Sequence, residues 1–411
     1  MSNRLRNTFL SLGLVFLSLV LGFVLVEISL RLIGFTYPAW EMRDNEVGFI
    51  GLPNATGIWT SEGPGGLVRF NNQGFRDVDR SIEKAPGTYR IAVLGDSFIQ
   101  AREVAPEQTF TQLTEKIVND CRPEKYKQIE VLNFGVGAYN TAAELQLLRS
   151  RVLAYKPDVV LLAFFVGNDI YRNHPEMDYY KTTSGIGIPL FQLKNGKVTM
   201  DMSFRDDPVF QAKMNSTYHR IMLSLINTSV TFQFLNYARR NYKGWLGISG
   251  TAHGGNKGKS TEYKDADPAD ANAEWIREEI WIGNNLSMYP PKSRLWTEAW
   301  QMTEYGIREM AQEAASIDAK FAMMLIAHPP QVHTDAETPP VYAQQRLKVL
   351  GQELDAEVID LLPAFHARYL ENHQFLYGFS EEQAGDGHWN PNGHILAAET
   401  ASREICRSLL K

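Results

Sequence analysis

The sequence contains little cysteine and no excess of basic charge. It holds two cysteines, Cys121 and Cys406, in 411 residues, which excludes a small scaffold held together by many disulfides. Its 41 basic residues are outnumbered by 47 acidic ones, so we expect no nucleic-acid partner. It also lacks an internal repeat and a cluster of metal-ligand residues, so we expect no metal or organic cofactor.

Length and hydrophobic content describe a large globular chain. The 411 residues allow one domain with insertions or two domains, and 44% of them are hydrophobic, as is usual for globular proteins.

The N-terminal segment is the exception. Thr8 to Val26 carries no charge and is roughly long enough to cross the hydrocarbon core of a bilayer. Arg4 and Arg6 precede it, which favours a cytoplasmic N-terminus. We predict an uncleaved signal-anchor over residues 1–35, crossing the inner (cytoplasmic) membrane once, with the rest of the chain extracytoplasmic, in the periplasm. A cleaved signal peptide is the alternative.

Residues 36–88 are rich in Gly, Pro and Asn and show no strong periodicity. We predict a connector that packs on the domain edge and carries a short hairpin. Beyond it, apolar runs alternate with helical patterns, which predicts a parallel sheet covered by helices on both faces. The predicted strands are 91–94, 129–134, 159–166, 321–327 and 358–362, and the predicted helices are 110–118, 141–154, 297–317, 342–354 and 391–410.

This alternation is interrupted over about residues 171–295, a span too long for a plain loop. We predict a helix over 211–242, a mobile tract over 247–259 and an aromatic segment beyond it. The insertion either forms a lid or substrate wall, or builds a small core of its own. Its aromatic residues are Trp275, Trp281, Tyr289 and Trp296.

Four short motifs fall at or near the carboxyl ends of predicted strands, where ligands of open α/β sheets bind. Ester cleavage needs a nucleophile, a base and a group that orients the base, and Ser97, His388 and Asp386 fit these roles. It also needs donors for the developing oxyanion. The motifs are Gly95-Asp96-Ser97, residues 133–139, Gly167-Asn168-Asp169 and Asp386-Gly387-His388.

Together, the four motifs resemble those of the SGNH (GDSL-type) hydrolase superfamily, over roughly residues 90–410. The resemblance implies a flavodoxin-like three-layer sandwich over 89–411, whose five-stranded parallel sheet has the order 2-1-3-4-5. It implies an oxyanion hole made by the Ser97 backbone, the backbone near Gly137 and Ala138, and the Asn168 side chain. Gly74-Phe75-Arg76-Asp77, after a membrane segment, is similar to anchored bacterial members.

The same strand order would place the helices that hold Cys121 and Cys406 on one sheet face, so the resemblance also suggests a disulfide between them.

The sequence departs from the family motifs at two positions. Ala138 best matches the family's second-motif glycine, and alanine tolerates positive φ poorly. Asp386 lies two residues before His388, where family members commonly have three, although some polysaccharide-acetylating relatives share the shorter gap. A backbone carbonyl is the alternative partner for the imidazole.

Four other polar or charged residues lie near these motifs. We predict that Asp96 caps a helix, that Asp169 anchors loops and that His328 is structural. His394 is a rival base.

The resemblance implies a serine esterase that hydrolyses carboxylic esters. The Trp and Tyr residues of the insertion suit stacking on sugar rings, and the location suits an envelope or exported polysaccharide, so we expect an O-acetyl ester of an extracytoplasmic carbohydrate. A lipid ester is an alternative substrate, given the anchor. The first alternative is a polysaccharide O-acetyltransferase with the same triad, working with envelope polysaccharide machinery. The second is a non-catalytic envelope binding or assembly protein on the same fold.

Overall fold

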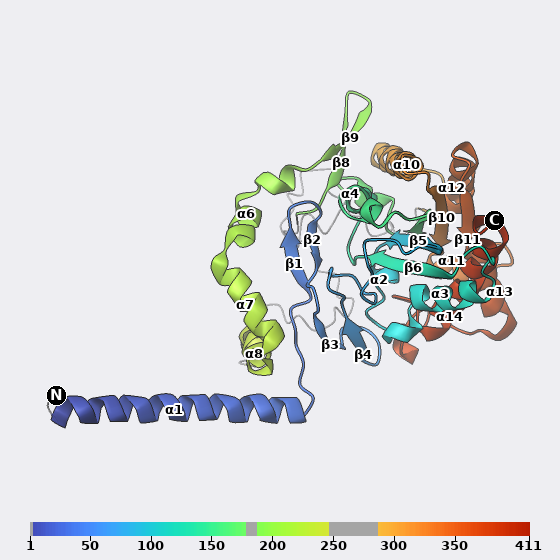
Figure 1. Cartoon of the computed structure of the whole chain (residues 1–411). Coiled ribbons are helices and arrows are strands. Elements are labelled where there is room, and N and C mark those ends of the chain that lie inside the picture. The colour runs from blue at the N-terminus through green and yellow to red at the C-terminus, as the bar shows by residue number, and fades with distance from the viewer. Residues whose placement is uncertain (1–2, 178–186, 246–286) are drawn as a thin grey trace.

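The computed structural model describes residues 3–177, 187–245 and 287–411 (Figure 1). Its centre is a five-stranded sheet in which every pairing is parallel. Numbered along the chain, the strand order is 2-1-3-4-5, so the predicted flavodoxin-like arrangement is confirmed. In sheet order the strands are β6 (Gln128–Gly135), β5 (Thr88–Gly95), β7 (Val159–Phe165), β10 (Lys320–Ile326) and β11 (Glu357–Asp360).

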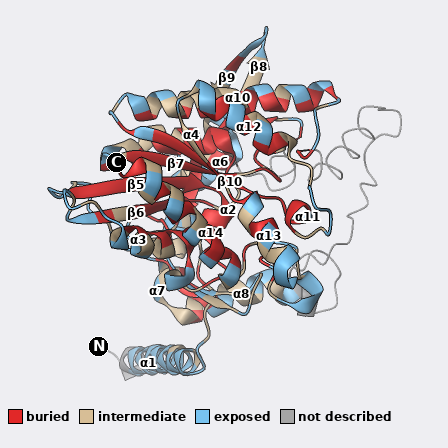
Figure 2. Cartoon of the chain, turned by 90° about the vertical axis from the view of Figure 1, so that its right-hand side faces the viewer, coloured by how far each residue is buried: buried red, intermediate tan, exposed pale blue. Residues whose placement is uncertain are grey.

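The central strands are continuous apolar runs because both of their faces are buried. In β5, Ala92 and Leu94 join the hydrophobic cluster on one face, whereas Ile91 and Val93 join the cluster on the other. Figure 2 shows the buried sheet between its helical layers. The first face is covered by α4 (Thr141–Ser150), α10 (Arg294–Ala315) and α12 (Tyr342–Glu353), and the second by α3 (Phe110–Asp120), α13 (Leu362–Asn372) and α14 (Pro391–Glu404).

All five predicted strands exist, and their ends agree with the structure to within a few residues. The predicted helices also exist, but two of them change character before they end. The helix α4 continues as a 3-10 turn over Val152–Tyr155, and α14 continues as a π-helical turn over Ile405–Leu409. The sequence analysis missed α13 and the short helices α2 (Ser97–Gln100) and α11 (Pro329–Val332).

The single helix predicted over residues 211–242 is wrong. The structure has three helices there, α6 (Pro208–Asn215), α7 (Thr217–Thr228) and α8 (Val230–Trp245). Ser216 and Ser229 separate them with extended backbone, and the Ser216 hydroxyl accepts a hydrogen bond from the His219 N–H. Serine favours this N-cap position because its side chain competes with continued helix.

The insertion also contains a hairpin that the sequence analysis missed, β8 (Leu190–Lys194) with β9 (Lys197–Asp201). Asn195-Gly196 forms its turn with positive φ at both residues, and Asn-Gly is a strong hairpin signal. Trp296 begins α10 and is buried against the sheet, so it serves the main core. Tyr289 is 50% exposed. Trp275, Trp281 and the tract 247–259 lie outside the described residues.

The connector carries two hairpins, β1 (Glu41–Asp44) with β2 (Gly48–Gly51), and β3 (Thr56–Trp59) with β4 (Gly66–Arg69). Two residues of the Gly-Phe-Arg-Asp motif tie it to the sheet domain. The buried guanidinium of Arg76 donates to the carbonyl oxygens of Leu67, Gln100 and Val104. The Asp77 carboxylate accepts the Asn133 N–H of β6 at 3.2 Å.

Before the connector, α1 (Asn3–Leu32) projects away from the sheet domain (Figure 1). Its stretch Asn7–Leu32 is long and apolar enough to cross a membrane, and none of it is buried. An N-terminal signal sequence has the same properties.

Cys121 and Cys406 form a disulfide, with their Cα atoms 6.1 Å apart. This agrees with the pairing that the family resemblance suggested. Cys121 ends α3 and Cys406 lies in the last helical turn of the chain. The bond therefore joins two neighbouring helices across a sequence separation of 285 residues.

Replacing both Cys121 and Cys406 by serine is predicted to lower the free energy of unfolding by about 2–4 kcal/mol, because the bond restricts the unfolded chain. Thermal unfolding of the full chain in detergent would be followed by circular dichroism, with and without reductant. We expect reductant to lower the melting temperature of the wild type and to leave that of the double variant unchanged. Equal melting temperatures for both oxidised proteins would contradict the prediction.

Candidate active site

Ser97 lies where β5 turns into α2. The strand ends at Gly95, and the buried Asp96 caps α2 by accepting the Phe98 N–H at 2.9 Å. Asp96 therefore has the capping role predicted for it. Ser97 is the first residue of α2, and its side chain stays partly accessible to solvent. The serine hydroxyl is thus presented at the carboxyl edge of the sheet.

His388 approaches Ser97 from the loop before α14. Its Nε2 lies 2.7 Å from Ser97 Oγ, although the two residues are 291 positions apart in sequence. Its Nδ1 lies 2.6 Å from Oε2 of Glu62, and its backbone N–H donates to Oε1 of Glu62 at 2.8 Å. Both carboxylate oxygens of Glu62 therefore hold His388, which fixes the plane of the ring with Nε2 facing the serine.

The predicted role of Asp386 is not supported, because Glu62 occupies the Nδ1 position. The Asp386 carboxylate turns back and accepts the Gly387 N–H at 2.8 Å, and the residue is exposed. Glu62 comes instead from the loop between β3 and β4 of the connector. The connector therefore completes the site as well as packing on the domain edge.

Gly387 has a physical reason to stand between Asp386 and His388. Its φ is +77°, and a Cβ built on it would lie 2.3 Å from Oε1 of Glu62. Any other residue would be strained at this φ and would push the carboxylate away. The glycine of the Asp-Gly-His sequence thus leaves space for the Glu62 carboxylate, which comes from a distant part of the chain.

A second carboxylate lies behind the first. Glu103 follows α2, is 5% exposed and has Oε1 3.7 Å from His388 Nδ1. Its backbone is held in place because Arg76 donates to the carbonyl oxygen of the next residue, Val104. His388 therefore faces the negative charge of two glutamates that are 41 residues apart in sequence.

These neighbours shift three pKa values. Burial alone would lower the pKa of His388, but the Glu103 and Glu62 carboxylates outweigh it and raise the value to about 9. Burial opposes ionisation of Glu62, yet its hydrogen bonds and charge interaction with His388 lower its pKa. Burial raises the pKa of Glu103, with His388 acting against it.

The backbone near Gly137 and Ala138 lies beside the serine. A Cβ built on Gly137 would lie 3.7 Å from Ser97 Cβ, and the Gly137 N–H donates to Oε1 of Gln100 at 3.1 Å. Ala138 adopts φ of +69°, a conformation that costs an L-residue roughly 1–2 kcal/mol. The alanine thus takes the backbone conformation that the glycine of the family motif would adopt freely.

Arg172 holds Ala138 in this conformation. Its buried guanidinium donates to the carbonyl oxygens of Ala138 and Tyr139. These bonds fix the peptide that follows Ala138, while Gln100 fixes the N–H of Gly137. The N–H groups of Ser97 and Ala138 are therefore the candidate backbone donors of the site.

Asn168 lies across from Asp96 and is partly exposed. Its amide donates to Oδ2 of Asp96 at 3.2 Å. A primary amide has two N–H donors, so one remains for a substrate oxygen. The buried Asp169 accepts the Phe165 N–H at 2.8 Å, which anchors the loop as predicted. Burial raises the pKa of Asp169, and the nearby Asp96 and Glu144 carboxylates add to the effect.

The two other histidines near the motifs do not reach the serine as a base. His394 is 1% exposed and packs edge-on against Trp389 with ring centroids 5.4 Å apart. Burial lowers its pKa to about 3. His328 is buried beside Phe165, and burial lowers its pKa to about 4. His328 therefore has the structural role expected for it, and the alternative that His394 is the base is not supported.

Sequence reasoning missed Glu62, Glu103 and Arg172. Glu62 is 326 residues from His388 and belongs to no local pattern, so no spacing rule could have found it. The departure in the Asp–His gap was the one available signal, because it indicated that the orienting acid could come from elsewhere. Among the described residues, Glu62, Glu103 and His388 are also a possible metal-binding group. A metal there would have to break the hydrogen bond between Glu62 and His388.

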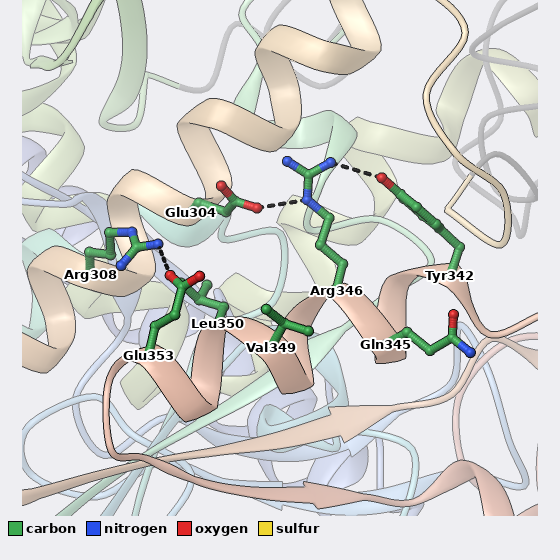
Figure 3. A pocket seen from close by; sticks show the side chains of 8 residues that line it. All are labelled: Glu304, Arg308, Tyr342, Gln345, Arg346, Val349, Leu350 and Glu353. Atoms are coloured by element: carbon green, nitrogen blue, oxygen red, sulfur yellow. Dashed lines mark hydrogen bonds and ion pairs between the residues drawn. The ribbon is translucent and has the colours of Figure 1, made fainter.

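A surface groove of about 400 Å³ lies outside this site, between α10 and α12. Figure 3 shows the side chains that line it. Its charged side chains pair with one another, Arg346 with Glu304 and Arg308 with Glu353. No residue of the Ser97 site lines it.

Comparison with known proteins finds solved structures with low sequence identity to this chain. No family model matches the chain, and no curated protein is similar to it in sequence. Among solved structures, it is similar to a G-D-S-L family protein from Desulfitobacterium hafniense DCB-2, with 12% identity over 76% of this chain and 98% of that one, and a TM-score of 0.34.

Two further solved structures are esterases. The acetyl xylan esterase AlAXEase shows 13% identity over 77% of this chain and 99% of its own, with a TM-score of 0.37. Axe2, an acetyl-xylooligosaccharide esterase from Geobacillus Stearmophilus, shows 13% identity over 79% and 96%, with a TM-score of 0.37.

The variant Glu103→Gln is predicted to lower the pKa of His388, because it removes a negative charge that favours the imidazolium. Histidine-selective isotope labelling and NMR titration of the full chain in detergent would measure this pKa, with His388→Ala identifying the signal. The exposed Glu371 gives the matched control, Glu371→Gln, which should leave the titration unchanged. An unchanged His388 titration in Glu103→Gln would show that Glu103 does not act on the imidazole.

Proposed function

We propose that this chain is a serine hydrolase of the SGNH type that cleaves carboxylic esters outside the cytoplasmic membrane, to which α1 anchors it. The observation that carries the proposal is the hydrogen-bonded series Ser97 Oγ, His388 Nε2, His388 Nδ1 and Glu62 Oε2, with separations of 2.7 and 2.6 Å. This is the arrangement of nucleophile, base and orienting acid that acyl transfer requires.

In the proposed reaction, Ser97 Oγ attacks the ester carbonyl carbon while His388 Nε2 takes the hydroxyl proton. The N–H groups of Ser97 and Ala138 and the free amide hydrogen of Asn168 bind the oxyanion. Collapse of this intermediate breaks the bond to the alcohol, and His388 returns its proton to the leaving oxygen. Water then attacks the carbonyl carbon of the acyl-enzyme while His388 Nε2 takes its proton. Collapse of this second intermediate breaks the bond to Ser97 Oγ, His388 returns the proton to Oγ, and the carboxylic acid leaves. Throughout, Glu62 stabilises the imidazolium and fixes its orientation.

The elevated pKa of His388 bears on this reaction. The free imidazole is the base that starts the reaction, and the Glu103 and Glu62 carboxylates favour the protonated ring by raising the pKa of His388 to about 9. The carboxylates that raise the pKa also stabilise the imidazolium formed during the attack.

For the substrate, we propose an O-acyl ester, acetyl above all, on an extracytoplasmic carbohydrate. Ser97 and His388 are both partly exposed, and Asp386 and Gly387 beside them are exposed, so a group on a large polymer can approach. Among the aromatic residues that the sequence analysis named in the insertion, Tyr289 is described and 50% exposed, so its ring is available to stack on a sugar ring. Trp296 does not serve this purpose because it is buried.

The acyl-enzyme could also pass its acyl group to a sugar hydroxyl, which would make the protein an O-acetyltransferase. Both reactions use the same residues and differ in the acceptor. A non-catalytic protein on this fold is disfavoured by the short distance between Ser97 and His388.

The variant Ser97→Ala is predicted to lose hydrolysis of p-nitrophenyl acetate by at least about 10³-fold, since among the described residues Ser97 is the nucleophile bonded to His388. Initial rates of the full chain in detergent would be compared with those of wild type. The measurement would be repeated with an acetylated donor and a sugar acceptor. Acetylation of the sugar without hydrolysis would identify a transferase. Equal rates from both proteins in both assays would contradict the proposal.

The variant Glu62→Gln is predicted to reduce kcat by about 10²–10⁴-fold, because a neutral amide neither fixes the imidazole tautomer nor stabilises its charge. Asp386→Asn is the matched control, since Asp386 bonds only to the neighbouring backbone in the site, and it should retain nearly the wild-type kcat. A larger loss of kcat in Asp386→Asn than in Glu62→Gln would show that Asp386 orients the imidazole.

A further inference from the structure

The helices α6, α7 and α8 follow one another in a column that runs across the direction of α1 (Figure 1). The column forms the edge of the molecule on the side toward which the N-terminal part of α1 extends. A bilayer that α1 crosses would therefore lie nearer to this column than to the sheet domain.

Contacts fix α8 to the end of α1. The Glu27 carboxylate accepts the N–H groups of Val230 and Thr231, at 3.1 and 2.8 Å, and the hydroxyls of Ser229 and Thr231, both at 2.8 Å. A carboxylate suits the positive end of a helix dipole. Arg31 donates to the Thr228 carbonyl oxygen at 3.1 Å and pairs with Glu27.

The depth of this junction follows from helix geometry. The charge-free segment Thr8–Val26 is about 28 Å long at 1.5 Å per residue, close to the thickness of the hydrocarbon core. Glu27 then lies at its outer boundary. One turn deeper, Phe23 contacts Phe232 of α8, with ring centroids 6.0 Å apart. The start of α8 is thus at the level where lipid tails meet headgroups.

Aromatic side chains gather at this level. Phe35, just beyond α1, contacts Phe234 and Tyr237 with centroids 5.7 and 5.8 Å apart, and Tyr37 also packs on Tyr237 at 5.1 Å. Aromatic rings are enriched where membrane proteins cross the boundary between lipid and water.

The composition of the column suits a lipid surface. Residues 208–242 contain four basic residues and no acidic one, although acidic residues outnumber basic ones in the whole chain. Six large apolar side chains on the column are between 37% and 74% exposed. Basic charge with exposed apolar and aromatic groups is typical of helices that lie in the membrane interface. The basic residues are Lys213, Arg220, Arg239 and Arg240, and the apolar ones are Val209, Tyr218, Ile221, Phe234, Leu235 and Tyr242.

We propose that the column of α6, α7 and α8 lies on the outer leaflet of the membrane that holds α1, with its apolar side chains among the lipids and its arginines at anionic headgroups. The column and α1 then form two attachments in different directions, which hold the sheet domain in one orientation over the membrane. This inference rests on the proposed membrane anchoring by α1 and is independent of the esterase chemistry.

Depth-dependent fluorescence quenching tests the proposal. Because both native cysteines form a disulfide, a single added cysteine can be labelled with an environment-sensitive dye. Full-length Ile221→Cys and Leu235→Cys would be reconstituted in phosphatidylcholine vesicles, with and without phosphatidylglycerol, that carry nitroxide lipids. Leu17→Cys, in the middle of α1, reports on the anchor. Val349→Cys, 54% exposed on α12, is the matched control on the opposite side of the sheet domain.

We expect nitroxide near the headgroups to quench the dyes at residues 221 and 235 at least by half, more strongly in vesicles with phosphatidylglycerol. The dye at residue 17 should be quenched by nitroxide deep in the acyl chains, and the dye at residue 349 by neither. Quenching at residue 17 without quenching at 221 and 235 would overturn the proposal and leave the anchor intact. Absence of quenching at residue 17 would overturn both.

A second copy of the chain is the competing occupant of this face. It would change the dye emission at residues 221 and 235 with protein density in the vesicles, without quenching by nitroxide lipids, and this result would also overturn the proposal. Replacing Arg239 and Arg240 by glutamine should remove the difference between vesicles with and without phosphatidylglycerol.

Discussion

The bond between Glu62 and His388 is the interaction on which the candidate site depends. Ser97 is placed by its own strand and cap, and His388 by the loop before α14. Glu62 fixes the ring so that Nε2 faces the serine, by binding both the ring and the backbone of the histidine. Burial of the histidine would otherwise favour its neutral form, so the carboxylate both orients the base and stabilises its charged state.

This interaction explains why the connector is held so firmly. Glu62 comes from a hairpin outside the sheet, so the hairpin must be fixed relative to the sheet for the site to exist. Arg76 joins the hairpin to the segment that carries Glu103, and Asp77 joins the connector to β6. The sequence Gly74-Phe75-Arg76-Asp77 thus links the two parts of the site.

The sequence predicted the sheet and the serine and histidine because these features leave local signals. A buried parallel strand is a continuous apolar run, and the motifs at strand ends keep their order along the chain. The orienting acid left no such signal, since a glutamate in a glycine-rich loop resembles any surface residue. The three helices over 208–245 were merged for a related reason. A serine inside a helical pattern does not by itself mark a break, but Ser216 and Ser229 have extended backbone between the helices, and the Ser216 hydroxyl caps α7.

The disulfide shows that strand order can predict a long-range contact that no local sequence pattern predicts. Neither cysteine has a neighbour in sequence that indicates its partner, and their separation of 285 residues allows no argument from spacing. The strand order 2-1-3-4-5 nevertheless places α3 and α14 side by side on one sheet face. Glu62 could not be found in this way, because the connector precedes the sheet and no rule of sheet topology fixes where it packs. Long-range contacts within the alternating part of the chain are therefore predictable from strand order. Contacts made by segments outside it depend on side-chain packing alone.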